Sequence, residues 1–179
     1  TVDFAQKKIP AGAEDSLVSM LPMAHMYGLA FELTYPICSG VTIYFLGKTP
    51  SPTLLLKAMQ TVKPFMVVTV PLVMEKIYKS AIKPVLSTTT MKFLTAIPGI
   101  NNIIYGKIGK KLDEKFGGKV GYYIMGGAPL NPEVEKLFKK IGLKYCVGYG
   151  MTEACPLLAY EHPDKFKLGS CGKPVDCAT

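Results

Sequence analysis

The chain has 179 residues, of which 49% are hydrophobic and 19% charged, a composition that excludes an intrinsically disordered protein and allows one domain with a substantial core. Its net charge of +8 comes from lysines, and lysines without interleaved aromatic motifs are weak evidence for nucleic-acid binding, so we expect no nucleic-acid partner. This charge suits a phosphate-rich ligand or an anionic membrane surface, although a solvated surface is the simplest explanation.

The cysteines and histidines indicate neither a metal site nor a disulfide framework. The five cysteines lack Cys-x-x-Cys spacing and lie mostly among apolar residues, so we expect reduced core residues in a cytoplasmic protein. His25 and His162 are too few and too far apart in the sequence for a zinc site. No apolar run approaches the roughly 20 residues of a membrane-spanning helix, and no secretory leader is visible.

The first half of the chain, after residues 1–12 that carry no capping pattern, predicts alternating strands and helices. A short strand over residues 17–21 enters Pro22, and His25 lies in the following loop. Residues 65–70 are the clearest buried strand, because an uninterrupted apolar run is typical of a parallel strand covered on both faces. A further strand is expected over residues 41–45, and helices over residues 27–37, from Pro52 and from Pro71. The helix from Pro71 has apolar residues near helical spacing and is interrupted by a proline; these residues are Leu72, Val73, Ile77, Tyr78 and then Pro84.

Residues 85–119 differ in character from the rest of the chain. Apolar residues are punctuated by Pro98 and Gly99 and are followed by a lysine-rich stretch over residues 107–115, a pattern that predicts two short amphipathic helices. These helices either pack on the sheet or form a basic patch that rests peripherally on the inner face of a membrane. Both alternatives are open from the sequence.

The second half contains a strand–turn–helix–strand–turn unit. Residues 120–125 are an apolar strand that ends in the glycine-rich turn 126–130. Asn131 then caps a helix, Gly142 ends it, and the next strand begins at Tyr145. This is a βαβ unit, so we expect an α/β fold with a layered, mostly parallel β-sheet and flanking helices. In such sheets the turns at the carboxyl ends of parallel strands form the binding crevice.

The second turn, residues 148–153, carries groups that suit a nucleotide. Gly148 and Gly150 lack Cβ atoms where another backbone or a flat ligand comes close, and Tyr149 between them offers a ring face. Thr152 can hydrogen-bond a phosphate oxygen, and Glu153 is a hard oxygen ligand suited to magnesium. The alternative is an ordinary β-turn that is capped by the threonine and the glutamate.

Three motifs in this order resemble the adenylate-forming superfamily, which includes acyl-CoA synthetases, luciferases and the adenylation domains of peptide synthetases. They are Leu21-Pro-Met-Ala-His-Met-Tyr-Gly28, Gly126-Gly-Ala-Pro-Leu130 and Gly148-Tyr-Gly-Met-Thr-Glu153. The first and third look most like the long-chain fatty acid–CoA ligase branch. The resemblance implies that residues 1–179 are a central fragment of the large N-terminal AMP-binding domain, without the upstream phosphate loop and the C-terminal domain. We therefore expect this fragment alone to be inactive.

The resemblance also implies ligands and residue roles. The ligands are ATP, Mg²⁺, coenzyme A and a fatty acid. In the catalytic roles, Thr152 would bond the α-phosphate and Glu153 would hold the magnesium. The nucleotide would contact Gly126, Gly127, Ala128, Pro129, Gly148, Tyr149, Gly150, Met151 and Thr152. The acyl and coenzyme A channel would be bordered by His25, Tyr27, Gly28, Gly150 and Met151.

Two other functions fit the same motifs. An adenylation domain could load an acyl or amino acid onto a carrier protein, but an amino acid would need an anionic residue in the acyl pocket, and none is evident. A non-catalytic nucleotide-binding module would have no physical need to keep Thr152 and Glu153. The sequence predicts no oligomeric state.

Overall fold

A five-stranded parallel sheet forms the centre of the computed structural model, which describes residues 1–176. Its strands are β1 (Ser16–Ser19), β2 (Thr42–Phe45), β3 (Met66–Thr69), β4 (Tyr122–Met125) and β5 (Tyr145–Val147). They lie in the order β2-β1-β3-β4-β5, and every neighbouring pair is parallel. The expected α/β fold is therefore confirmed.

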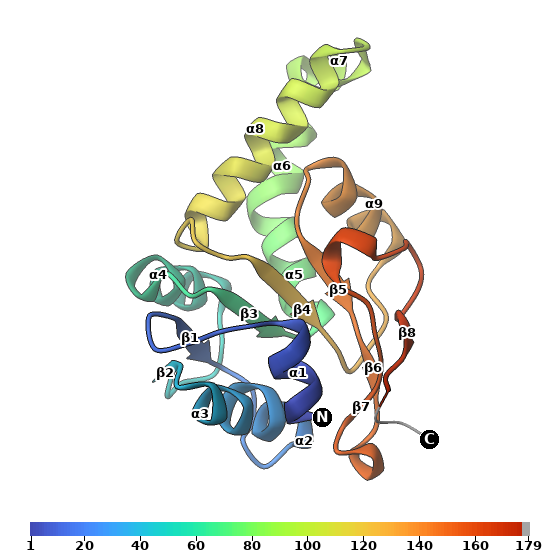
Figure 1. The fold of residues 1–179 in the computed structure, drawn as a ribbon. Coiled ribbons are helices and arrows are strands. Elements are labelled where there is room, and N and C mark those ends of the chain that lie inside the picture. Colours follow the sequence, from blue (N-terminus) through green and yellow to red (C-terminus); the bar gives the residue numbers. More distant parts are fainter. Residues whose placement is uncertain (177–179) are drawn as a thin grey trace.

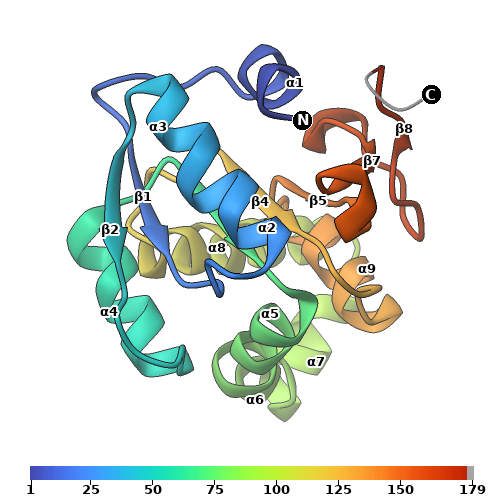
Figure 2. The ribbon, with the colours of Figure 1, turned by 90° about the horizontal axis from the view of Figure 1, so that it is seen from below.

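Helices cover both faces of this sheet (Figures 1 and 2). One face carries α1 (Val2–Lys8) and a continuous helical run made of α2 (Met26–Gly28), the π-helical turn η1 (Leu29–Thr34) and α3 (Tyr35–Ser39). The other face carries α4 (Pro52–Val62), α5 (Pro71–Ile77), α8 (Ile100–Lys115) and α9 (Pro132–Lys140). Because both faces are covered, Val67 and Val68 on the central strand have no exposed surface, as their apolar run predicts.

The βαβ unit from β4 through α9 to β5 forms for the local reasons visible in the sequence. Asn131 Oδ1 accepts hydrogen bonds from the backbone N–H of Glu133 at 2.9 Å and of Val134 at 3.4 Å, which satisfies two free donors at the start of α9. Gly142 ends the helix with φ of +72°, a left-handed conformation that glycine adopts without strain. The expected cap, helix and strand order are confirmed.

The segment between β3 and β4 is a long helical excursion. After α5 come the π-helical turn η2 (Tyr78–Ile82), α6 (Lys83–Leu86), α7 (Thr89–Ala96) and α8. Pro84 occupies the start of α6, so it changes the helix type and does not break the helical path. The second helix of this segment was expected to be short, but α8 has 16 residues. Its end packs against α4 and α9, whereas α7 and the beginning of α8 project from the body (Figure 1).

The chain leaves the parallel sheet after β5 and enters a second, antiparallel sheet that we did not predict. This sheet contains β6 (Tyr149–Gly150), β7 (Leu157–Tyr160) and β8 (Lys173–Pro174), with the 3₁₀ turns η3 (Thr152–Ala154) and η4 (Pro163–Lys165) in the connections. The N-terminal α1 was also not predicted. Within residues 1–176, no helix is long and apolar enough to cross a membrane.

One expectation about the core was wrong, and the buried face of α5 includes fewer of the apolar residues at helical spacing than the sequence offers. Leu72 is 58% exposed, because the buried face of α5 is set by Pro71, Met74 and Ile77 at a spacing of three residues. Among the cysteines that the structure describes, all are free, but only Cys146 is buried, while the exposed ones are Cys38, Cys155 and Cys171. Cys38 lies on α3 and Cys155 follows η3, so an apolar neighbour in the sequence does not by itself bury a side chain. Cys177 lies outside the described residues.

Candidate functional site

The two glycine-rich turns of the sequence lie side by side at the carboxyl end of the sheet. The backbone N–H of Gly148, just after β5, donates a hydrogen bond to the carbonyl of Met125, the last residue of β4, at 2.8 Å. The N–H of Gly126 donates in turn to Thr69 at the end of β3, at 3.2 Å. The expectation that both turns open onto the same edge of the sheet is confirmed.

The segment that follows β1 reaches the same edge. His25 caps α2, and its Nδ1 accepts a hydrogen bond from the backbone N–H of Tyr27 at 3.1 Å. The Tyr27 hydroxyl lies 3.2 Å from the carbonyl oxygens of both Thr69 and Ile124, so it donates to the ends of β3 and β4. All three sequence motifs therefore meet in space, because each follows a parallel strand of one sheet.

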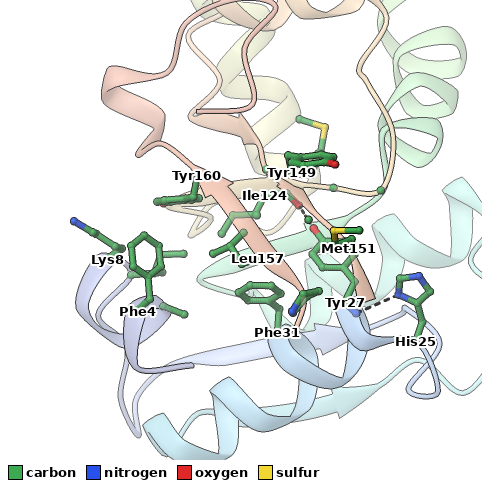
Figure 3. A pocket seen from close by; sticks show the side chains of 18 of the residues that line it. Phe4, Lys8, His25, Tyr27, Phe31, Ile124, Tyr149, Met151, Leu157 and Tyr160 are labelled. Atoms are coloured by element: carbon green, nitrogen blue, oxygen red, sulfur yellow. Dashed lines mark hydrogen bonds between the residues drawn. The ribbon is translucent and has the colours of Figure 1, made fainter. Parts of the chain in front are cut away.

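A cavity of about 220 Å³ lies between these segments and is open to solvent (Figure 3). Tyr149, Thr152 and His25 bring polar groups to it, and most of its remaining wall is apolar. Lys8 and His25 lie at opposite ends of it (Figure 3). Such a concave site, with an apolar wall and a few polar groups, is typical of small-molecule binding.

Most of the site residues expected from the sequence line this cavity, and some do not. The lining residues among them are His25, Tyr27, Gly126, Gly127, Gly148, Tyr149, Gly150, Met151 and Thr152. Four others lie outside the lining: Gly28, Ala128, Pro129 and Glu153. The Glu153 side chain is exposed on the η3 turn, adjacent in sequence to the lining residue Thr152.

The absence of a side chain at three of these glycines has a structural reason. A Cβ on Gly150 would overlap the carbonyl oxygen of Pro156, because the β6–β7 hairpin folds back at that point. A Cβ on Gly28 would lie 2.5 Å from the carbonyl oxygen of Pro22, and one on Gly126 would lie 3.1 Å from the Tyr27 ring. At Gly150 the close neighbour is therefore protein backbone, the first of the two alternatives given by the sequence, and at Gly28 it is protein backbone as well.

Several lining residues were missed from the sequence because they come from elements that were not predicted. Phe4 and Lys8 of α1 close one end, and Leu157 and Tyr160 of β7 form a side wall. The rings of Phe4 and Tyr160 meet edge to face with centroids 5.9 Å apart, which joins the two ends of the chain. A signal existed in the sequence, since residues 157–160 are a short apolar run bounded by proline and polar residues.

A buried carboxyl group supports the wall that carries Tyr27. Glu32, on the η1 turn, has no exposed surface, and its Oε2 accepts hydrogen bonds from the backbone N–H groups of Met20 at 2.9 Å and Leu21 at 2.7 Å. Burial raises the pKa of Glu32 to about 7, although these hydrogen bonds oppose the rise. Burial also raises the pKa of Tyr27 well above its ordinary value, so its hydroxyl stays protonated and donates.

The polar residues at the cavity, Thr152 and the neighbouring Glu153, suit a phosphate ligand that binds together with a divalent cation. No group of three or more His, Cys, Asp or Glu side chains that could hold a metal occurs within the described part of the chain. Magnesium bound with nucleotides, however, needs only one or two protein carboxylates, because substrate phosphates and water supply its other ligands. The exposed Glu153 beside Thr152 fits that requirement.

A model of the AMP-binding enzyme family matches residues 1–179, and the chain belongs to this family. Among similar proteins, long-chain-fatty-acid–CoA ligase 1 of Saccharomyces cerevisiae is 28% identical over 188 residues, covering 94% of this chain and 26% of that protein. Long-chain-fatty-acid–CoA ligase 5 of Rattus norvegicus is 29% identical over 177 residues, covering 92% and 26%.

Solved structures confirm the fold. O-succinylbenzoate coenzyme A synthetase from Bacillus subtilis, in complex with ATP and magnesium ion, superposes with a TM-score of 0.69 at 18% identity, covering 98% of this chain and 30% of that one. The chain thus spans between about a quarter and a third of the length of the proteins it matches. The activity of the complete protein is therefore proposed below.

Proposed function

We propose that the complete protein is a long-chain fatty acid–CoA ligase. In the first half-reaction, a fatty acid carboxylate oxygen attacks the α-phosphorus of ATP, which forms an acyl-adenylate and releases pyrophosphate. In the second, the thiol of coenzyme A attacks the acyl carbon, which forms the thioester and releases AMP. The family membership and the similar ligases support this proposal.

The observation that carries the proposal is the single cavity between the two glycine-rich turns. Gly127 and Tyr149 come from different strand exits and line the same space, so one nucleotide can contact both. The apolar lining residues, among them Phe31 and Leu157, suit an aliphatic chain (Figure 3). Polar groups beside an apolar wall are what a reaction between ATP and a fatty acid requires.

The proposed residue roles are those that the family resemblance implies for the matching positions. Tyr149 is 54% exposed beside the cavity, so we propose that its ring stacks on the adenine. The backbone of Gly126, Gly127 and Gly148, which line the cavity, would meet the adenine edge, and Ala128 and Pro129, which lie outside the lining, would continue the turn behind them. Thr152 would hydrogen-bond the α-phosphate, where negative charge must be stabilised during attack.

The acyl group and coenzyme A would pass between the remaining lining residues. Gly150 and Met151 would border the acyl pocket, together with His25 and Tyr27 of the same cavity lining. Gly28 would act indirectly, because its missing Cβ leaves room for the Pro22 carbonyl in the loop before His25.

Glu153 is the residue that we propose holds magnesium together with the ATP phosphates. The bound ion would neutralise part of the phosphate charge.

In the complete enzyme, Glu153→Ala should lower the rate of fatty-acid-dependent ATP–pyrophosphate exchange by roughly a hundredfold, a loss typical of removing one electrostatic contact to a transition state. Glu133→Ala, which removes an exposed carboxylate on α9, is the matched control and should keep the wild-type rate. Wild-type exchange by Glu153→Ala would refute the magnesium assignment.

The cavity favours a fatty acid over an amino acid as substrate. No Asp or Glu lines it among the described residues, so nothing in this wall would pair with the ammonium group of an amino acid. Mass spectrometry of the complete enzyme's products, with a ladder of fatty acids and the amino acids as competing substrates, decides between the two. Aminoacyl products, or acyl transfer only to a carrier protein, would replace the proposed function with the carrier-loading alternative.

A further inference from the structure

A second hollow lies far from the nucleotide cavity, between η2, α6 and α8, and has a volume of about 500 Å³. Its floor is apolar and is formed by Ala81, Ile82, Val85, Ile104, Ile108 and Leu112. We refer to this hollow as the α6–α8 groove. None of the residues expected from the family motifs lines it, so the proposed ligase chemistry leaves it unexplained.

A row of lysines forms one rim of the α6–α8 groove. Lys107, Lys111 and Lys115 line it, are exposed, and follow one another at intervals of four residues, so they lie on one side of α8. The sequence has no Asp or Glu between Glu75 and Asp113, and within residues 1–176 neither ion pair involves a lysine of this row. Asp113 and Glu114, which lie between Lys111 and Lys115 on α8, offset part of this charge, but residues 76–119 contain nine lysines against these two acids, so the segment keeps an excess of positive charge.

The helices beside the groove also expose large apolar side chains. Phe93 on α7 is 71% exposed, Ile103 on α8 is 61% exposed, and Val85 on α6 and Ile100 at the start of α8 are 48% and 40% exposed. The helices α7 and the beginning of α8, which carry Phe93, Ile100 and Ile103, project from the body (Figure 1). An apolar cluster beside a cationic row on a projecting helical hairpin marks an interaction surface.

We infer that the α6–α8 groove and the projecting ends of α7 and α8 dock on an anionic phospholipid bilayer. The lysine row meets the lipid phosphates, and the apolar groove and the exposed Phe93 and Ile103 enter the boundary between head groups and acyl chains. The charge pattern favours this occupant, because a purely apolar partner would not use the lysines and a nucleic acid would not use the isoleucines.

Such docking explains features that the alternative of packing on the sheet leaves open. The second half of α8 is anchored to the body through the buried Gly109 and Leu112, with Tyr105 and Ile108 also packed against the core, whereas Ile100 and Ile103 at its beginning are exposed. The bilayer is also where a long-chain fatty acid would partition. The inference does not depend on the ligase activity, because it rests on a surface outside the nucleotide cavity.

The test uses flotation of the complete enzyme with vesicles of phosphatidylcholine alone or mixed with phosphatidylserine. We expect wild-type protein to float with the mixed vesicles only, and to be released by high salt, which screens the charges. Lys107→Glu/Lys111→Glu/Lys115→Glu should weaken binding by at least about tenfold, since each lysine near an anionic surface is worth roughly fivefold. Phe93→Ser/Ile103→Ser should also weaken binding, and should leave its salt dependence in place.

A matched charge variant separates this surface from the overall charge of the protein. Lys136→Glu/Lys139→Glu/Lys144→Glu changes the same number of exposed lysines on α9 and the turn after it, and should float like wild type. ATP–pyrophosphate exchange with a short, water-soluble acid, measured on every variant, reports whether the nucleotide site is intact independently of membrane binding.

Three outcomes would overturn the inference. Recovery of the complete enzyme at the bottom of the gradient with anionic vesicles would show that the surface does not bind lipid. Equal losses by the α8 and α9 triple variants would show that total charge is responsible. Loss of cellular membrane association by the α8 variant, with vesicle binding unchanged, would show that the partner is a membrane protein.

Discussion

The backbone N–H of Gly148 donates to the carbonyl oxygen of Met125 at 2.8 Å, and this hydrogen bond joins the exits of β5 and β4. It places Tyr149 and Gly127, two residues on either side of the nucleotide cavity, close enough to contact one ligand. Had the two turns opened onto opposite edges of the sheet, no nucleotide could have touched both. The first prediction tests this shared contact directly.

Replacing Tyr149 should weaken ATP binding in the complete enzyme. Tyr149→Ala removes the ring that we place on the adenine, and a base–aromatic stack is worth about 1–3 kcal/mol, so the KM for ATP should rise roughly tenfold or more. Tyr149→Phe keeps the ring and should retain the wild-type value. Initial-rate kinetics with ATP varied and fatty acid saturating measure this effect, and an unchanged KM in Tyr149→Ala would remove the stacking role.

Two glycines of α8 should respond to alanine in opposite directions. A Cβ on Gly109 would overlap the carbonyl oxygen of Ile141 at the end of α9, so Gly109→Ala should destabilise the protein by about 1–3 kcal/mol. Gly106 has no atom within 4 Å of the position of its Cβ, so Gly106→Ala should stabilise the helix by up to about 1 kcal/mol. Thermal unfolding of the complete enzyme and both variants compares them, and equal shifts would show that the α8–α9 contact is not tight.

Stability should depend on pH through Glu32. Burial raises its pKa from 4.5 to about 7, so between these values the folded state keeps a proton that the unfolded state releases. On account of this group, the free energy of unfolding should fall as the pH rises from about 4.5 to about 7, by at most about 3 kcal/mol. The group's contribution should be constant below about 4.5 and above about 7.

The variant that checks this is Glu32→Gln, which keeps an oxygen acceptor for the N–H groups of Met20 and Leu21 without an ionisable proton. Its melting temperature should change less than that of wild type across this pH range. The melting temperature of the variant minus that of wild type should therefore increase as the pH rises. The exposed Glu133→Gln serves as the control and should follow the wild-type curve. Parallel curves for Glu32→Gln and wild type would show that Glu32 is ionised in the folded protein throughout.

Residues 1–179 by themselves should form no acyl-CoA and should bind ATP weakly. Within the cavity lining, Lys8 and His25 are the side chains able to carry positive charge, and neither belongs to the phosphate-binding loop or C-terminal domain that the family resemblance implies. Missing electrostatic contacts of this kind cost about 3 kcal/mol each. Incubation with ATP, magnesium, coenzyme A and palmitate, followed by mass spectrometry, tests this, and measurable palmitoyl-CoA would contradict it.

Much of the fold could be predicted because its signals are local. Asn131 and Gly142 bound α9 through hydrogen bonds and backbone conformation within a few residues, and residues 65–70 show their burial on both faces through composition alone. The elements that were missed depend on distant partners. β7 is held by pairing with β6 and β8, and α1 by contacts such as that between Phe4 and Tyr160.

The candidate site was predicted in its residue types and only partly in its geometry. The sequence identified Tyr149 and Thr152 as groups that suit a nucleotide, and both line the cavity. It gave no indication that Glu32 is buried. A single acid in a helical sequence is usually exposed, and Glu32 becomes buried only because the segment after β1 packs against it and donates a hydrogen bond from Met20. It left open whether another backbone or a flat ligand approaches Gly150, and the structure shows that the backbone carbonyl of Pro156 does.

By itself, the sequence determined the parallel strands, the caps of α9 and the order of the three motifs, because these depend on side-chain periodicity and on hydrogen bonds between near neighbours. Only the tertiary structure decided that the motifs share one cavity, that α1 and β7 complete its wall, and that α7 and α8 project with exposed Phe93 and Ile103. Those features depend on contacts between residues far apart in the chain. Such contacts can form only after the sheet has brought these segments together, so no short stretch of sequence reveals them.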